Sequence, residues 1–138
     1  MIDILILFTS HCIADFPMQG EFISKWKSKS LYVLLCHCAI YTLTVLIGLY
    51  VVTLRHAIPY TEIDWTFLAA ILFYTHFIID YIKCSYRIKL YNRHEIDIDV
   101  DFDGRQQQNQ EVWKRDKLIF YADQIVHIVI VMAILACI

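Results

Sequence analysis

The stretch from Ser10 to Gly20 reads Ser-His-Cys-Ile-Ala-Asp-Phe-Pro-Met-Gln-Gly and follows the apolar run Ile-Leu-Ile-Leu-Phe at positions 4–8. Within it, His11, Asp15 and Gln19 stand four residues apart. Residues at that spacing share one face of a helix. An imidazole and a carboxylate on an apolar helix are costly unless they find polar partners. The rest of the chain is therefore expected to supply those partners.

Three other apolar segments carry the same residue types. His76 and Asp80 repeat the His-x-x-x-Asp spacing. Asp123 and His127 reverse it, and His37 stands alone in a further segment. We expect all of these side chains to meet at one site, formed by His11, Asp15, His37, His76, Asp80, Asp123 and His127.

Composition places the chain among membrane proteins. Of its 138 residues, 59% are hydrophobic and the mean hydropathy is +0.52, which is too apolar for an ordinary soluble domain. Three Gly and two Pro favour long helices over a loop-rich β fold. The predicted fold is a single all-α domain, an integral membrane bundle of four transmembrane helices at about residues 2–16, 31–54, 65–91 and 112–138. The first segment lacks a basic leader and an A-x-A site, so we expect it to be retained.

The connections indicate an orientation. Residues 20–30 are basic and amphipathic, which is typical of an interfacial segment, and the composition of residues 92–111 predicts an acidic, solvated loop. Eleven of the twelve Lys and Arg lie in or beside the 1–2 and 3–4 connections. Those connections are therefore predicted to be cytosolic, with both termini outside. In this topology the seven His and Asp residues all fall in the cytosolic half of the membrane.

A divalent metal would satisfy such a group of imidazoles and carboxylates. Mixed His and Asp ligands suit Zn, Mn, Fe or Ni, as one ion or as two ions bridged by carboxylates. We interpret the seven residues as ligands, with catalytic roles for Asp80, Asp123, Gln19 and Gln124. The basic cluster at Lys25, Lys27 and Lys29 is predicted to attract an anionic headgroup or nucleotide.

Simpler interpretations stay open. The same residues could form a structural His–Asp network between helices, or a proton relay. Asp99, Asp101 and Asp103 precede Gly104 as in a calcium loop, but position twelve is Gln110 rather than a bidentate Glu, which favours a solvated loop without calcium. No nucleic-acid partner is expected, and a homodimer would help to cover a polar site in so small a bundle.

The motif set resembles a known family. His11-x-x-x-Asp15-Phe-x-x-Gln19, His37, His76-x-x-x-Asp80 and Asp123-Gln-x-x-His127 are similar to domain-of-unknown-function family 3307, small multi-pass membrane proteins of bacteria and phages. The resemblance covers essentially the whole chain and implies fold and topology rather than an activity. It implies the bacterial inner membrane as the location.

Two functions from different classes follow. The preferred hypothesis is a membrane-embedded, metal-dependent hydrolase of a phosphorylated lipid or an amphipathic anion. The alternative is a non-catalytic membrane protein, either an ion or proton carrier or a phage-encoded factor that binds a host membrane complex.

Overall fold

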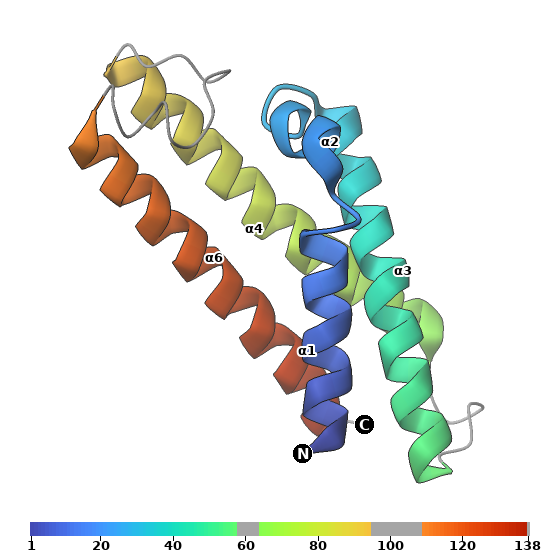
Figure 1. Ribbon diagram of the computed structural model, residues 1–138. Coiled ribbons are helices and arrows are strands. Elements are labelled where there is room, and N and C mark those ends of the chain that lie inside the picture. The colour runs from blue at the N-terminus through green and yellow to red at the C-terminus, as the bar shows by residue number, and fades with distance from the viewer. Residues whose placement is uncertain (58–63, 95–108, 138) are drawn as a thin grey trace.

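The computed structural model describes residues 1–57, 64–94 and 109–137. These form α1 (Ile2–Asp15), α2 (Gly20–Trp26), α3 (Leu31–His56), α4 (Trp65–Arg93) and α6 (Gln110–Cys137). Both termini lie at one end of the bundle, and the short helix α2 lies at the opposite end (Figure 1). The predicted all-α class is confirmed, and the observed bounds differ from the predicted ones by one or two residues at most helix ends.

Local sequence signals set the helix ends. Pro17 follows the end of α1, and Gly20 has a positive φ of 54°, a conformation that glycine adopts at little cost. Beyond this turn, α2 lies at the end of the bundle, beside the first turns of α3 (Figure 1). The Ser30 hydroxyl caps α3, and the Asp64 carboxylate caps α4 by accepting from the Phe67 amide at 2.9 Å.

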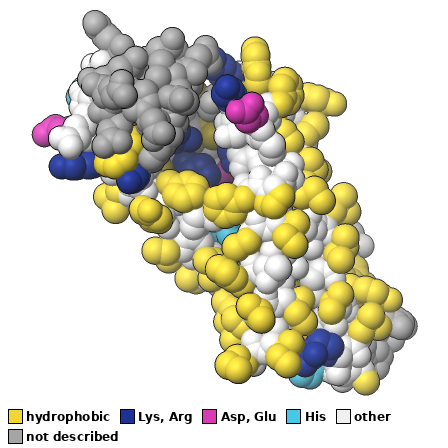
Figure 2. Space-filling model, in the orientation of Figure 1, with side chains coloured by type: hydrophobic (Ala, Val, Ile, Leu, Met, Phe, Trp, Pro, Cys, Tyr) yellow, Lys and Arg dark blue, Asp and Glu magenta, His cyan; other side chains and the backbone are white. Residues whose placement is uncertain are grey.

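Three helices in the described part of the chain are long and apolar enough to cross a membrane, namely α3, α4 and α6. The 14 residues of α1 are fewer than the roughly 20 that a helix needs to span a bilayer core. Large apolar side chains stay exposed along the long helices (Figure 2). Among them, Ile47 is 65% exposed and Phe67 62%. Such a surface suits a nonpolar environment.

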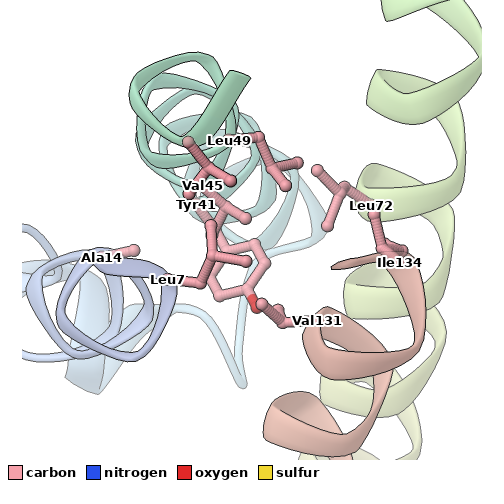
Figure 3. Packing of buried hydrophobic residues seen from close by; sticks show 9 residues of the cluster. Leu7, Ala14, Tyr41, Val45, Leu49, Leu72, Val131 and Ile134 are labelled. Atoms are coloured by element: carbon pink, nitrogen blue, oxygen red, sulfur yellow. The ribbon is translucent and has the colours of Figure 1, made fainter. Parts of the chain in front are cut away.

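The apolar core fills the half of the bundle nearest the termini. It contains Leu7 of α1, the α3 residues Tyr41, Val45 and Leu49, and residues from α4 and α6, among them Leu72, Val131 and Ile134 (Figure 3). Helices α1 and α3 approach closely at Gly48, where an added Cβ would lie 2.9 Å from the Ser10 Cβ. The buried His, Asp and Lys side chains lie in the other half of the bundle.

Some predictions fall outside the described residues. The calcium-like residues Asp99, Asp101 and Asp103 belong to the span 95–108, and the connection between α3 and α4 covers 58–63. These predictions stay predictions.

Candidate metal centre

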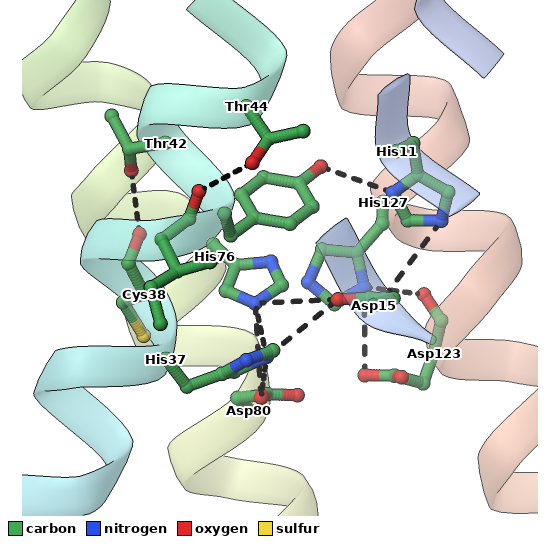
Figure 4. Close-up of polar contacts among 12 residues, drawn as sticks. His11, Asp15, His37, Cys38, Thr42, Thr44, His76, Asp80, Asp123 and His127 are labelled. Atoms are coloured by element: carbon green, nitrogen blue, oxygen red, sulfur yellow. Dashed lines mark hydrogen bonds and ion pairs between the residues drawn. The ribbon is translucent and has the colours of Figure 1, made fainter. Parts of the chain in front are cut away.

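All seven predicted site residues converge in one buried cluster at the junction of α1, α3, α4 and α6 (Figure 4). Each of them is at most 7% exposed. The four-residue spacing along α1, α4 and α6 turns each His–Asp pair to the bundle interior, as the sequence predicts. The residues come from segments more than one hundred positions apart in the chain.

Four side-chain atoms form the centre of this cluster. They are Asp15 Oδ1, His37 Nε2, His76 Nε2 and Asp80 Oδ2. The two imidazole nitrogens lie 3.1 Å apart. His37 Nε2 lies 3.6 Å from Asp15 Oδ1 and 3.3 Å from Asp80 Oδ2. The corresponding distances from His76 Nε2 are 3.9 and 3.7 Å.

The distances from the two imidazole nitrogens are close to those between two ligands of one ion. With metal–ligand bonds of 2.0–2.2 Å, tetrahedral donor atoms lie about 3.3–3.6 Å apart. All five distances that involve a nitrogen lie between 3.1 and 3.9 Å. Two overlapping triads have donor atoms within 4.8 Å of one another, Asp15–His37–His76 and His76–Asp80–His127. The residues present could therefore hold a metal ion.

Several buried polar atoms in the cluster lack a hydrogen bond. They include Asp15 Oδ1 in the centre and His127 Nε2 beside it. Leaving such an atom unsatisfied in a low-dielectric interior costs about 1–3 kcal/mol. An ion among them would remove part of this cost, which is a second reason to consider the cluster a ligand set.

Two lysines enter the cluster and were not among the predicted ligands. Lys27 follows α2, is 8% exposed and donates to Asp80 Oδ2 at 2.9 Å. Its Nζ also lies 3.4 Å from His37 Nε2. Lys83 of α4 bridges two carboxylates, 2.5 Å from Asp80 Oδ1 and 2.6 Å from Asp123 Oδ2. Both ammonium groups neutralise acids that would otherwise stand unpaired.

A charge count leaves one carboxylate uncompensated. Asp15, Asp80 and Asp123 carry three formal negative charges, whereas Lys27 and Lys83 carry two positive ones. Within the described residues, Asp15 is the acid without a lysine partner; its Oδ2 accepts from the Gln124 amide at 3.2 Å and lies 3.9 Å from His11 Nε2. The cluster therefore favours one further cation next to Asp15, either a metal ion or a proton on an imidazole.

The remaining predicted residues form a shell around this centre. The Gln124 Oε1 atom lies 3.1 Å from His11 Nε2, and the Gln124 Nε2 donates to Asp123 Oδ2 at 3.2 Å. His127 Nδ1 lies 2.9 Å from the Asp123 backbone carbonyl, which orients the ring. With its amide nitrogen facing α1, Gln19 donates to the Asp15 carbonyl at 2.6 Å and accepts from Lys27 at 2.9 Å. His11, Gln19 and Gln124 thus position the central residues.

A signal for some of the missed residues was present in the sequence. Lys83 follows Asp80 by three positions, and Tyr41 follows His37 by four, so both share a helix face with a predicted ligand. Tyr41 stacks on the His76 ring at 3.7 Å between centroids. Lys27 has no such signal. Anion binding by Lys27 stays a prediction. The structure buries Lys27, whereas Lys25 and Lys29 of the same basic cluster are exposed.

The bundle and its centre define an all-helical protein with three helices suited to a membrane and a buried His/Asp cluster that could hold a metal ion. The chain belongs to the family described as "Protein of unknown function (DUF3307)", whose profile matches residues 4–138. The resemblance seen in the sequence is thereby confirmed. No curated protein and no solved structure matches the chain.

Proposed function

We propose that this protein is a membrane-embedded, metal-dependent hydrolase that acts on a phosphorylated lipid or an amphipathic anion. The observation that carries the proposal is the convergence of Asp15, His37, His76 and Asp80. Their two imidazole nitrogens lie 3.1 Å apart, and one oxygen of each carboxylate lies 3.3–3.9 Å from both nitrogens. Two imidazoles and two carboxylates suit Zn, Mn, Fe or Ni. A bound ion of this kind supplies an activated water and polarises a phosphoryl or carbonyl oxygen.

The lysine contacts favour one bound ion over two. The hydrolytic two-metal sites use carboxylates to bridge two cations. Here the Lys83 ammonium bridges Asp80 and Asp123 and takes the place that a second cation would need. We therefore propose one divalent ion, with Lys83 as a permanent neighbouring positive charge.

The other catalytic roles are assigned to residues of the cluster and of the cavity beside it. Asp80 binds the ion, and Asp123 is the candidate base, held by Lys83 and by the Gln124 amide. Gln19 and Gln124 line a cavity next to the centre and can orient a substrate there. Because the cavity lies on the α2 side, whose connections carry most Lys and Arg, we propose that it opens toward the cytosol of a bacterial cell.

A non-catalytic function is the second candidate. It is favoured by Lys27 and Lys83, which already pair Asp80 and Asp123, so that a proton on one histidine would complete the charge balance. In that case the cluster is a structural network of a carrier, or of a factor that binds a host membrane complex. The apolar core between the cluster and the termini weighs against a carrier, because ions would need polar groups along that path.

The test compares Asp80→Asn and Asp123→Asn with Asp3→Asn, the same change at the opposite end of the bundle. Detergent-purified proteins are loaded with Zn or Mn and assayed against a panel of phosphoesters and amides. We expect turnover to be lost in the first two variants and kept in the third. Retained turnover in Asp80→Asn with a wild-type melting temperature would refute the assignment.

A further inference from the structure

A cavity of about 530 Å³ lies directly against the candidate metal centre. Asp15 of the centre forms one part of its wall, and the rest comes from α1, α2, α4, α6 and the turns around α2. Figure 2 shows a hollow in the surface with Lys or Arg and Asp or Glu side chains inside it and hydrophobic ones along its border. Its volume is in the range of ordinary ligand pockets, about 300–1,000 Å³.

Three cations face this cavity, namely Lys27 after α2 and, one turn apart on α4, Lys83 and Arg87. Three acids line it as well, Asp15, Glu21 and Asp116, so the lining has no net formal charge. A divalent ion at the centre would make the cavity positive. The cavity is therefore suited to an anion, and we expect the anion to bind when the metal is present.

Arg87 is held in position for such an anion. Asp116 of α6 contacts its Nε at 2.7 Å and its Nη2 at 3.0 Å, and Tyr91 accepts from the same Nη2 at 3.1 Å. Among the described residues, Nη1 has no protein partner. A guanidinium fixed along one edge presents its remaining donors in a defined direction, which suits the planar, multidentate recognition of phosphate.

An apolar border lies beside these charges. Phe16 at the end of α1 and Phe120 of α6 both line the cavity. Their rings are arranged edge to face, with 6.2 Å between the ring centroids. They are 52% and 41% exposed, on the outer surface of helices that present other apolar side chains. A ligand that fills the cavity and crosses this border needs a charged end and an apolar part.

From these observations we propose that the cavity binds the phosphate monoester headgroup of a lipid, with the phosphate at Lys27, Lys83 and Arg87 and the lipid tail leaving over Phe16 and Phe120. This proposal rests on the proposed function and names its substrate class. In the reaction, water adds to phosphorus, the phosphorus–oxygen bond to the lipid breaks, and the water's proton passes to the lipid oxygen. The products are inorganic phosphate and the lipid alcohol.

The test measures binding, so that it is independent of turnover. Dihexanoyl phosphatidic acid, glycerol 3-phosphate and dihexanoylglycerol are titrated calorimetrically into micelle-solubilised protein, metal-loaded or chelator-treated. For metal-loaded protein we expect the phosphatidic acid to bind at least about tenfold more tightly than either of the other two, because it satisfies both the cations and the apolar border.

Two variants assign the contacts. Arg87→Gln is expected to weaken phosphatidic acid binding about tenfold, whereas Arg115→Gln, the same charge change on an exposed residue of α6, should leave it within about twofold. Phe120→Ser should weaken the lipid but not glycerol 3-phosphate, and it keeps the test valid if Arg87→Gln does not fold.

Equal binding of glycerol 3-phosphate and phosphatidic acid would overturn the lipid assignment and indicate a soluble phosphoester. Equal binding by loaded and chelated protein would overturn the link between anion and metal. Neither result bears on the proposal of a metal centre. That proposal would be contradicted by the absence of bound metal from the same preparations.

Discussion

His37 Nε2 and His76 Nε2 lie 3.1 Å apart at the centre of the bundle, on two different helices and 39 positions apart in the chain. One oxygen of Asp15, on α1, and one of Asp80, on α4, lie 3.3–3.9 Å from both nitrogens. Two imidazole nitrogens at this distance either share one proton or face a common cation. Metal content and its dependence on pH separate these two states.

Acidification should release the metal from a folded protein. Imidazole ligands bind a metal only in their neutral form, so protons compete with the ion at His37 and His76. Metal content measured after dialysis is expected to be lower at about pH 5 than at about pH 8. A content that does not change over this range, in protein with unchanged helicity, would contradict imidazole ligation.

Removing Lys83 should change the number of bound ions. Lys83→Met leaves Asp80 and Asp123 facing each other without the ammonium that bridges them at 2.5 and 2.6 Å. We expect the metal content to rise from one toward two equivalents per chain, because a second divalent cation can take that place. The matched control is Lys89→Met, an exposed lysine on the same helix, which should keep one equivalent. One equivalent in folded Lys83→Met protein would disprove the role of Lys83 as a substitute cation.

Enlarging Gly48 should destabilise the contact between α1 and α3. A Cβ at this position would lie 2.2 Å from the Ser10 Oγ, so one of the two helices has to move. We expect Gly48→Val to lower the free energy of unfolding by about 1–3 kcal/mol. Thermal unfolding followed by circular dichroism in detergent measures this, with Ala39→Val on the exposed side of α3 as the control. Equal melting temperatures would mean that the close approach is not maintained in solution.

Replacing residues 95–108 by a Gly/Ser linker of equal length separates an enzyme from an adaptor. The residues named for the proposed centre and cavity come from the helices and from the turns around α2. Metal content and turnover are therefore expected to survive the replacement. If turnover is absent from both proteins and the replacement abolishes capture of a host membrane protein, the adaptor hypothesis is favoured.

Periodicity and residue type were enough to predict the helices and the convergence of the seven His and Asp residues. The reason is that an apolar helix leaves few places for a charged group, so the depth of each group follows from its position in its segment. The contacts of Lys27 could not be predicted in this way. They depend on the turn at Pro17 and Gly20, which sets the position of α2 and of Lys27 behind it, and no periodic pattern in the sequence specifies that turn.

The pairing of Lys83 with both Asp80 and Asp123 could not be predicted from the sequence either. Its spacing from Asp80 indicates a shared face, but the contact with Asp123 depends on how closely α4 and α6 pack. The Arg87–Asp116 pair has the same origin. Distances between helices are set by side-chain packing, which a single sequence does not specify.

The most direct measurement is the metal content of detergent-purified protein by inductively coupled plasma mass spectrometry. Wild-type protein is compared with His37→Ala/His76→Ala and with His56→Ala/His94→Ala, which removes two histidines outside the cluster. We predict close to one equivalent of Zn, Mn, Fe or Ni in the wild type and in the second double variant, and none in the first. Absence of bound metal from chelator-free wild-type protein, or equal content in all three, would contradict a metal centre and leave the cluster as a structural or proton-conducting network.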